Sequence, residues 1–402
     1  MDFRSLLILM VVVYSIGRVF KTLHLPVLFG ELVGGIIVGP VLLGLVHPGD
    51  EVIKVIAELG MFFLMLHSGL ETDPRDLMKS LKSSMLVAIG GAVVTFILVY
   101  FTTRWFGYDV IASVFVAMGS SISAIALCVR LFKDYDIQKT PAFNIAMGAA
   151  MVGDILALIM FSVILGVVEM REAGVVEISE LVKVASILIF KVVLFFAVIM
   201  VAGFKLAKHL NKLIYSGYRG FTVTLIIALV IGLLAEAIGL HIIIGAFLAG
   251  LFIREEIIEK EAFHKIEDRI YGLAYFFFGP VFFTSLAFSL DFTVFKTDPW
   301  YLLAIVVVSV IGKLVGAGVV SRMLKLSVWD SVAVGVAMNS RGAVELIIAS
   351  IGLSLGIINS TIFSTLVIMA LVTTVLSIFM MKPVAKKLLN GDVQKNLPSI
   401  ER

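Results

Sequence analysis

The sequence feature that most constrains the fold is a series of long apolar segments that recur along the whole chain. One of them, residues 142–168, reads AFNIAMGAAMVGDILALIMFSVILGVV. A helix needs roughly 20 apolar residues to cross a bilayer, and this segment is longer than that. The chain is 60% hydrophobic and only 15% charged, whereas soluble domains average about 25% charged residues. We therefore predict an all-α polytopic membrane protein.

About thirteen segments have the length and composition of a membrane-spanning helix. They lie at residues 5–22, 26–46, 51–70, 83–103, 109–131, 142–168, 181–206, 219–238, 240–254, 270–290, 299–321, 329–353 and 358–381. The segment at 240–254 is short and could pair with its predecessor as a broken or tilted element. We predict one transmembrane domain over residues 1–381 and a short cytoplasmic tail over residues 382–402.

Lysines and arginines are unevenly distributed between the loops. Alternate loops are basic, at residues 18–21, 75–82, 133–139, 205–219, 254–269 and 322–325, and the loops between them hold few basic residues and several acids. Cytoplasmic loops are enriched in Lys and Arg, so this alternation predicts an odd number of spans in a multi-pass protein, which we expect in the cell (inner or plasma) membrane. The N-terminus would lie outside and the C-terminus in the cytoplasm. These cytoplasmic charges also account for the net charge of +3, so no nucleic-acid partner is expected.

The only cysteine, Cys128, excludes an internal disulfide and a thiolate cluster. It lies in an apolar run, and we interpret it as a packing residue. Residues 30–44 and 245–250 both contain closely spaced small residues, which is a weak sign of an internal repeat. Secondary transporters use repeated halves with polar interruptions to build a site near the bilayer midplane.

Asp154 lies near the middle of segment 142–168. A charge at the bilayer centre costs about 2.5–3.5 kcal/mol even on lenient scales, so an acid there is by default a site on an ion or proton path. A carboxylate binds either a proton or a small hard cation such as Na⁺, and the two compete. The alternative is an acid in a structural ion pair.

Residues 119–123, Gly-Ser-Ser-Ile-Ser, interrupt the preceding apolar segment with hydroxyl groups. Unwound backbone at this depth exposes carbonyls that can bind a cation, provided that it lines a cavity. We therefore consider Ser120, Ser121 and Ser123 candidate site residues beside a helix break at Gly119. The alternative is a serine-rich packing face.

Two further groups of intramembrane polar residues lie in the second half of the chain. Lys313 lies deep in segment 299–321, where it must find a carboxylate or carbonyl partner or lose its proton; it belongs either to a proton path or to a structural brace. Asn339, Arg341, Gly342 and Glu345 lie together in segment 329–353. Arg341 and Glu345 are four residues apart on one helical face, so they can pair with each other. A structural pair, or an arginine braced against the carbonyls of a broken helix, is the favoured interpretation.

Several sequence motifs, taken in order, resemble those of a known transporter family. They are LPVLFGELVGGIIVGPVLLG at 25–44, LGMFFLMLHSGLETD at 59–73, SSISAIALCVRLFKD at 120–134, AAMVGDILALI at 149–159, IGAFLAGL at 244–251, GPVFFTSLAFSLDF at 279–292, GKLVGA at 312–317 and NSRGAVELIIASIGL at 339–353. Together they resemble the membrane domain of the monovalent cation:proton antiporters, most closely the second subfamily. The resemblance covers nearly the whole chain.

The resemblance implies a fold of thirteen helices with inverted repeats, divided into a dimerisation domain and a core domain. Two crossed, broken helices would lie in the core, one with Ser120 to Ser123 and the other with Asn339 to Glu345. Asp154 aligns with the ion-binding aspartate of the family, Ser123 with a hydroxyl beside the ion, and Lys313 with a core lysine of electrogenic members. The expected partners are Na⁺ or K⁺, protons, the lipid bilayer and a second copy of the chain in a homodimer.

Position 153 departs from the family pattern. Many electrogenic members have two adjacent aspartates, and potassium/proton relatives often have Gln at the first position, but this chain has Gly153. One titrating carboxylate makes one proton per cation the simplest cycle, to which Lys313 could add a second proton. The sequence therefore predicts a Na⁺(Li⁺)/H⁺ antiporter that works by alternating access. K⁺/H⁺ exchange is the first alternative and a channel or sensor on the same scaffold is the second; neither an enzyme nor a cofactor is expected.

Overall fold

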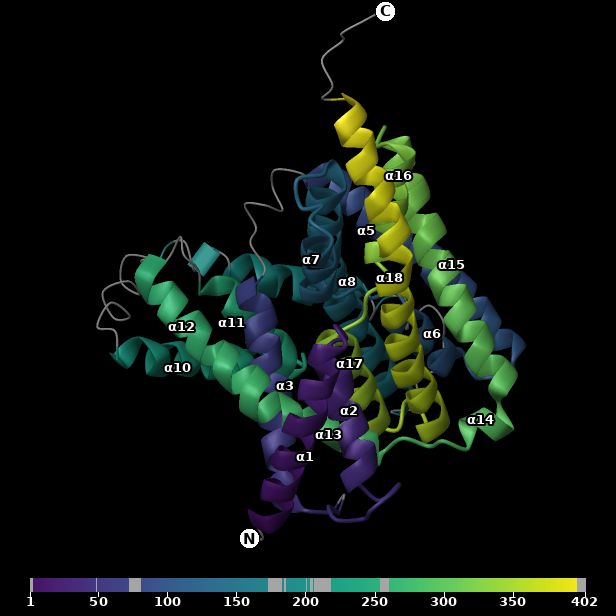
Figure 1. Ribbon diagram of the computed structural model, residues 1–402. Helices are drawn as coiled ribbons and strands as arrows, with labels where there is room; N and C mark the ends of the chain where they lie inside the picture. The colour runs from purple at the N-terminus through teal and green to yellow at the C-terminus, as the bar shows by residue number, and fades with distance from the viewer. Residues whose placement is uncertain are drawn as a thin grey trace, which may run out of the picture. The chain divides into compact units, whose positions relative to one another are not determined.

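The computed structural model describes residues 3–47, 49–71, 81–172, 183, 186–199, 201–202, 205, 218–253 and 260–395 (Figure 1). All regular secondary structure in this part of the chain is helical. Among the described residues, eight helices are long and apolar enough to cross a membrane, and six shorter apolar helices have 10–17 residues. The predicted all-helical fold is confirmed, whereas the number of thirteen spans stays a prediction.

The chain divides into two compact units, which are described one at a time. The first comprises Met1–Asp73 and Ser162–Leu290, and the second comprises Pro74–Phe161 and Asp291–Arg402. The labelled helices of the first unit are α1 (Phe3–Thr22), α2 (Val27–Val38), α3 (Glu51–Glu71), α10 (Tyr218–Ala237), α11 (Ile242–Phe252), α12 (Lys260–Leu273), the π-helix η1 (Ala274–Phe278) and α13 (Gly279–Phe288). A shorter apolar helix over Ser186–Ile199 belongs to the same unit.

Glycines allow the helices of the first unit to approach one another closely. A Cβ added at Gly35 of α2 would lie 2.7 Å from Cβ of Ala287 in α13, and one added at Gly60 of α3 would lie 2.9 Å from Cβ of Phe282. Small residues are common at helix contacts in membranes because they permit such close backbone approach. The closely spaced small residues of segment 30–44 therefore serve helix packing in this unit.

The second unit contains the same order of elements twice. Its helices are α5 (Leu81–Trp105), α6 (Val110–Gly119), α7 (Ile125–Asp134), the first part of α8 (Pro141–Glu172), α14 (Val294–Thr297), α15 (Pro299–Met323), α16 (Val328–Ala337), α17 (Ala343–Ser354) and α18 (Ser360–Lys395). In each half a long helix is followed by two short helices and then by another long helix. This order is compatible with an internal repeat, but whether the halves are inverted stays a prediction.

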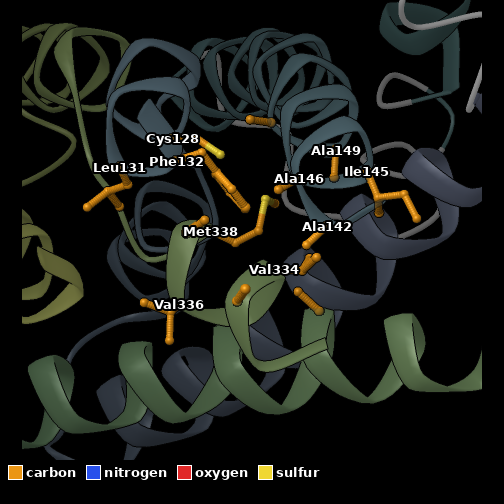
Figure 2. Packing of buried hydrophobic residues seen from close by; sticks show 14 of the residues in the cluster. Cys128, Leu131, Phe132, Ala142, Ile145, Ala146, Ala149, Val334, Val336 and Met338 are labelled. Atoms are coloured by element: carbon orange, nitrogen blue, oxygen red, sulfur yellow. The ribbon is translucent and has the colours of Figure 1, made fainter. Parts of the chain in front are cut away.

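A buried apolar cluster joins α7, α8 and α16 in the second unit (Figure 2). Ala142, Ala146 and Ala149 lie three or four residues apart, so they share one face of α8. Their short side chains belong to the same buried cluster as Cys128 and Phe132 of α7. The packing role expected for Cys128 agrees with this position, and the cluster fixes α8, which holds Asp154, against α7.

The last helix is longer than the sequence pattern indicates. Segment 358–381 was the expected span, but α18 continues to Lys395 and includes Pro383 in its interior. The first residues of the predicted tail, 382–395, are therefore helical. The rest of the predicted tail, residues 396–402, lies outside the described residues.

Candidate functional site

The first helix break follows α6 and occupies residues 120–124, where the sequence has its serine cluster. Asp109 caps the start of α6, because its carboxylate accepts hydrogen bonds from the backbone N–H groups of Ile111 and Ala112. At the other end, Oγ of Ser121 donates to the carbonyl of Ala117 at 2.7 Å. Serine hydroxyls that bond to their own backbone compete with helical hydrogen bonding, which favours the end of α6 here.

The second break lies between α16 and α17 and occupies residues 338–342. Within it, Nδ2 of Asn339 donates to the carbonyl of Gly335 at 2.9 Å. A Cβ added at Gly342 would lie 2.6 Å from Cβ of Ala124. Glycine at position 342 therefore allows the second break to approach the first.

Direct hydrogen bonds join the two breaks. Oγ of Ser123 donates to the carbonyl of Met338 at 2.7 Å, and the N–H of Ala124 donates to the carbonyl of Ser340 at 2.9 Å. The N–H of Arg341 in turn donates to Oγ1 of Thr374 on α18 at 2.8 Å. Each of these bonds satisfies a backbone group that the helix break leaves unpaired, as a hydrocarbon environment requires.

Two buried basic side chains donate hydrogen bonds to the carbonyls after the end of α6. Nζ of Lys313, on α15, donates to the carbonyl of Ser121, and Nη1 of Arg341 donates to the carbonyl of Ile122. These two side chains are 1% and 0% exposed. A helix C-terminus carries a partial negative charge of about half an elementary charge, so cations are favourable beside it.

Glu345 lies in the first turn of α17 and is 1% exposed. Its Oε2 is 3.7 Å from Nη1 of Arg341, so the pair expected from the four-residue spacing lies within ion-pair distance. Within the part of the chain that the structure describes, several atoms here have no hydrogen-bond partner: both carboxylate oxygens of Glu345, Nε and Nη2 of Arg341, and Oδ1 of Asn339. In this buried group the guanidinium of Arg341 lies within ion-pair distance of the carboxylate of Glu345, but several of their atoms make no hydrogen bond to a described residue.

Asp154 lies on α8 and is 2% exposed. It interacts electrostatically with Lys313, which also interacts with Arg341 and Glu345. A Cβ added at the neighbouring Gly153 would meet no other atom within 4 Å. Position 153 therefore has room for a side chain beside the buried carboxylate.

The structure thus brings most of the expected site residues together in the second unit. One hydrogen bond links Ser123 to Met338 of the other break, another links Ser121 to Lys313, and charge interactions with Lys313 add Asp154 and Glu345. Gly119 contacts a different neighbour, because a Cβ added there would lie 3.5 Å from Leu366 of α18. The hydroxyl of Ser120 is buried and has no hydrogen-bond partner among the described residues.

Thr374 is a residue of this group that sequence reasoning missed. It holds the N–H of Arg341, yet it lies in an apolar segment with no charge. The adjacent threonines Thr373 and Thr374 in segment 358–381 were the available signal.

The polar groups buried in this part of the second unit offer oxygen atoms of carboxylates, hydroxyls and backbone carbonyls. Among the described residues, no group of three or more His, Cys, Asp or Glu side chains is placed to hold a metal ion. Carboxylate, hydroxyl and carbonyl oxygens are hard ligands of the kind that hard cations bind.

Comparison with known proteins gives a consistent result. Residues 6–387 match the family described as "Sodium/hydrogen exchanger, transmembrane". The chain is 30% identical over 370 residues to the Na(+)/H(+)-K(+) antiporter GerN of Bacillus cereus, covering 91% of this chain and 92% of that protein. It is 28% identical over 388 residues to a Na(+)/H(+) antiporter of Enterococcus hirae, covering 96% and 99%. The solved structure of the sodium proton antiporter MjNhaP1 from Methanocaldococcus jannaschii has the same fold, with a TM-score of 0.73, 16% identity and coverage of 95% and 97%.

Proposed function

Because the chain belongs to the sodium/hydrogen exchanger family, we propose that it exchanges Na⁺ or Li⁺ for protons across a membrane by alternating access, with Asp154 as the shared site. The observation that carries this proposal is the position of Asp154: a buried carboxylate on a spanning helix, in the same unit as two hydrogen-bonded helix breaks. The named relatives are antiporters, and no enzymatic activity is proposed.

Competition at one carboxylate would couple the two ions. A proton on Asp154 removes the negative charge that attracts a cation, and a bound cation disfavours the proton. Alternating access can therefore expose the site to either side of the membrane with either ion bound to Asp154. Exchange then needs no energy source beyond the two gradients.

The ligands of the cation would come from Asp154, Ser123, Ser121 and the backbone of the breaks. Oγ of Ser123 donates its proton to Met338, which leaves its lone pairs available for a cation. We propose that the two broken helices cross, as the resemblance implies. Lys313, Arg341 and Glu345 would compensate charge around the site.

We further propose a homodimer in the cell membrane, with the N-terminus outside and the C-terminus in the cytoplasm. The first unit would supply the dimerisation surface and the second unit the ion-carrying core. The unequal distribution of basic residues between loops supports the orientation.

K⁺/H⁺ exchange is the second candidate. It is favoured by two observations: one relative is named a Na(+)/H(+)-K(+) antiporter, and Gly153 stands next to Asp154 where the family resemblance leads us to expect an acid in many electrogenic members. One carboxylate fewer weakens the field at the site, which favours a larger, less strongly hydrated cation.

The function can be tested with the purified protein in liposomes that contain a pH-sensitive dye. Na⁺, Li⁺ and K⁺ are added in turn, with and without an ionophore that clamps the voltage. Proton movement with Na⁺ or Li⁺ supports the proposal, and a response to K⁺ alone supports the second candidate. The absence of proton movement with all three cations contradicts antiport.

A pair of matched variants ties the activity to the site. Asp154→Asn should leave the protein folded and reduce exchange to the background of empty liposomes. Asp136→Asn makes the same chemical change at an exposed acid of the same unit and should leave exchange unchanged. Cation flux without proton movement would instead identify a channel.

A further inference from the structure

We propose that one end of the second unit binds the headgroup of an anionic phospholipid. The site, called the basic surface below, consists of exposed residues at the end of α15, in the turn after it, at the start of α16 and at the end of α18, namely Arg322, Lys325, Trp329, Lys382, Lys386 and Lys387. The helix α16 begins where α15 ends and packs against α18, so these residues lie at one end of the unit (Figure 1). Lipid binding at this surface is independent of the proposed antiport function.

The helix α18 is longer than the hydrocarbon core of a bilayer. Its candidate membrane span, Ser360–Leu389, has 30 residues. At 1.5 Å per residue this is about 45 Å, whereas the hydrocarbon core is about 30 Å thick. Even at the usual tilt of about 20°, such a helix extends into the headgroup region. The charged residues of the span begin only at Lys382, so its C-terminal end is the end that lies at headgroup level.

The end of α18 has one buried face and one exposed face. Four residues with helical spacing are buried in the apolar cluster with residues of α7 and α16, namely Met381, Val384, Ala385 and Leu388. Three lysines on the other side of the helix are exposed, namely Lys382, Lys386 and Lys387. Because the apolar contacts fix this end of α18, the lysines are presented to the headgroup region on a packed helix.

Trp329 joins the start of α16 to the end of α18. Nζ of Lys387 lies 5.9 Å from the centroid of the Trp329 ring, which is within cation–π distance. The indole is nevertheless exposed, and so are the neighbouring side chains of Val328 and Met323. Basic residues mixed with exposed Trp and aliphatic side chains are typical of the boundary between lipid headgroups and acyl chains. The composition of the basic surface therefore favours a lipid over a soluble anion.

The basic surface has an excess of positive charge. Residues 322–330 and 382–389 contain five basic side chains and one acid, Asp330. The carboxylate of Asp330 accepts a 2.6 Å hydrogen bond from Oγ of Ser327 at the start of α16, where an acid is favourable. Three of the lysines have no ion-pair partner among the described residues, namely Lys325, Lys382 and Lys386. The phosphate of an anionic phospholipid complements this charge.

The opposite end of the second unit differs in charge. Residues 291–300, around the start of α15, contain one lysine, Lys296, and two acids. The helix α15 has 25 residues, so its two ends are about 37 Å apart. Lys296 is exposed and lies far from the basic surface. It is therefore a matched control for the lysines of that surface.

Lipid at the basic surface would stabilise the elements that hold the second helix break. The helix α16 ends at this break, and Thr374 of α18 accepts a hydrogen bond from the N–H of Arg341 within it. A ligand that binds only the folded state raises its stability. We therefore expect an anionic phospholipid to raise the melting temperature of the protein more than a zwitterionic phospholipid does.

The test is thermal unfolding of the purified full-length protein in detergent, titrated with phosphatidylglycerol or with phosphatidylcholine of the same acyl chains. Phosphatidylglycerol should give the larger rise in melting temperature. Each basic residue near an anionic lipid contributes about fivefold in affinity, so Lys382→Gln with Lys386→Gln should raise the half-maximal phosphatidylglycerol concentration by roughly 25-fold. Lys296→Gln should leave that concentration unchanged. Lys382→Arg with Lys386→Arg, which keeps both charges, should behave as the wild type.

A variant of another element is available if the double lysine variant does not fold. Lys325 has a φ of 68°, a left-handed backbone conformation that glycine adopts without strain. Lys325→Gly should therefore fold, and it should raise the half-maximal phosphatidylglycerol concentration by about fivefold. An unchanged concentration in this variant overturns the proposal.

Glycerol phosphate distinguishes a lipid site from a site for free phosphate, because it has the phosphate but no acyl chains. It should not raise the melting temperature at concentrations at which phosphatidylglycerol does. Three other results overturn the proposal: equal effects of the two phospholipids, an equal effect of glycerol phosphate, and a wild-type response of the folded double lysine variant. Each measurement reports melting and not cation exchange, so failure of this proposal is distinguishable from failure of the proposed function.

Discussion

Nζ of Lys313 donates a hydrogen bond to the backbone carbonyl of Ser121, which lies 192 residues earlier in the chain. The bond joins α15 to the break after α6. It satisfies a carbonyl that the end of α6 leaves free, and it gives the buried ammonium a partner that does not depend on transported ions. Removal of the lysine should therefore affect both the stability of the core unit and the electrostatics of the site.

We expect Lys313→Met to lower the free energy of unfolding by about 1–3 kcal/mol, because it leaves the buried carbonyl of Ser121 without its hydrogen-bond donor. Lys191→Met is the control, because Lys191 is exposed and its contact with the carbonyl of Ile238 is a long 3.5 Å. Thermal unfolding in detergent measures both. Equal melting temperatures for the two variants would contradict the structural role of Lys313.

Ser123→Ala should weaken both the junction between the breaks and cation binding. It removes the 2.7 Å bond to the carbonyl of Met338, worth about 0.5–1.5 kcal/mol. If Oγ is also a ligand, the Na⁺ concentration at half-maximal exchange should rise by roughly tenfold for each 1.4 kcal/mol lost. The neighbouring Ser120→Ala removes a buried hydroxyl that has no partner among the described residues, so it should have little effect. Similar behaviour of the two alanine variants would argue against a special role for Ser123.

Thr374→Val should destabilise the second break. The substitution keeps the shape of the side chain but leaves the N–H of Arg341 without its 2.8 Å acceptor. An unsatisfied buried donor costs about 1–3 kcal/mol. Thr373→Val is the matched control, because Oγ1 of Thr373 donates to the carbonyl of Ala370 within the same helix. A melting temperature lowered equally by both valine variants would show that the bond from the N–H of Arg341 to Thr374 adds no particular stability.

The sequence predicts which polar residues take part in this site better than it predicts which of them are in contact. The four-residue spacing of Arg341 and Glu345 predicts their pairing, although Arg341 lies in the break before α17 and only Glu345 lies on that helix. The partner of Lys313 could only be limited to a carboxylate or a carbonyl, because Ser121 comes from another helix and its position depends on the tertiary fold. Thr374 was missed for the same reason. The π-helix over Ala274–Phe278 was also unforeseen, because its apolar sequence has the composition of an ordinary spanning helix.

Two glycines of α15 test the packing that holds Lys313 in place. A Cβ at Gly316 would lie 2.9 Å from Cα of Gly91 in α5, whereas one at Gly318 would lie 3.4 Å from the carbonyl of Ser331. Overpacking of this kind costs typically about 1–3 kcal/mol. Gly316→Ala should therefore lower the melting temperature. Gly318→Ala should leave it unchanged or raise it, because alanine is the better helix former. The reverse order would contradict the α5–α15 interface.

Cation binding should itself stabilise the protein in a way that identifies the site. A ligand that binds only the folded state adds about 2.7 kcal/mol of stability at 100 times its dissociation constant. We therefore expect Na⁺ to raise the melting temperature of the wild type relative to an equal concentration of choline. The increase should be lost in Asp154→Asn and kept in Asp136→Asn, since Asp154 is buried and Asp136 is exposed. Lower pH should also diminish it, because protons compete for the same carboxylate. An undiminished Na⁺ effect in Asp154→Asn would place the cation elsewhere in the molecule.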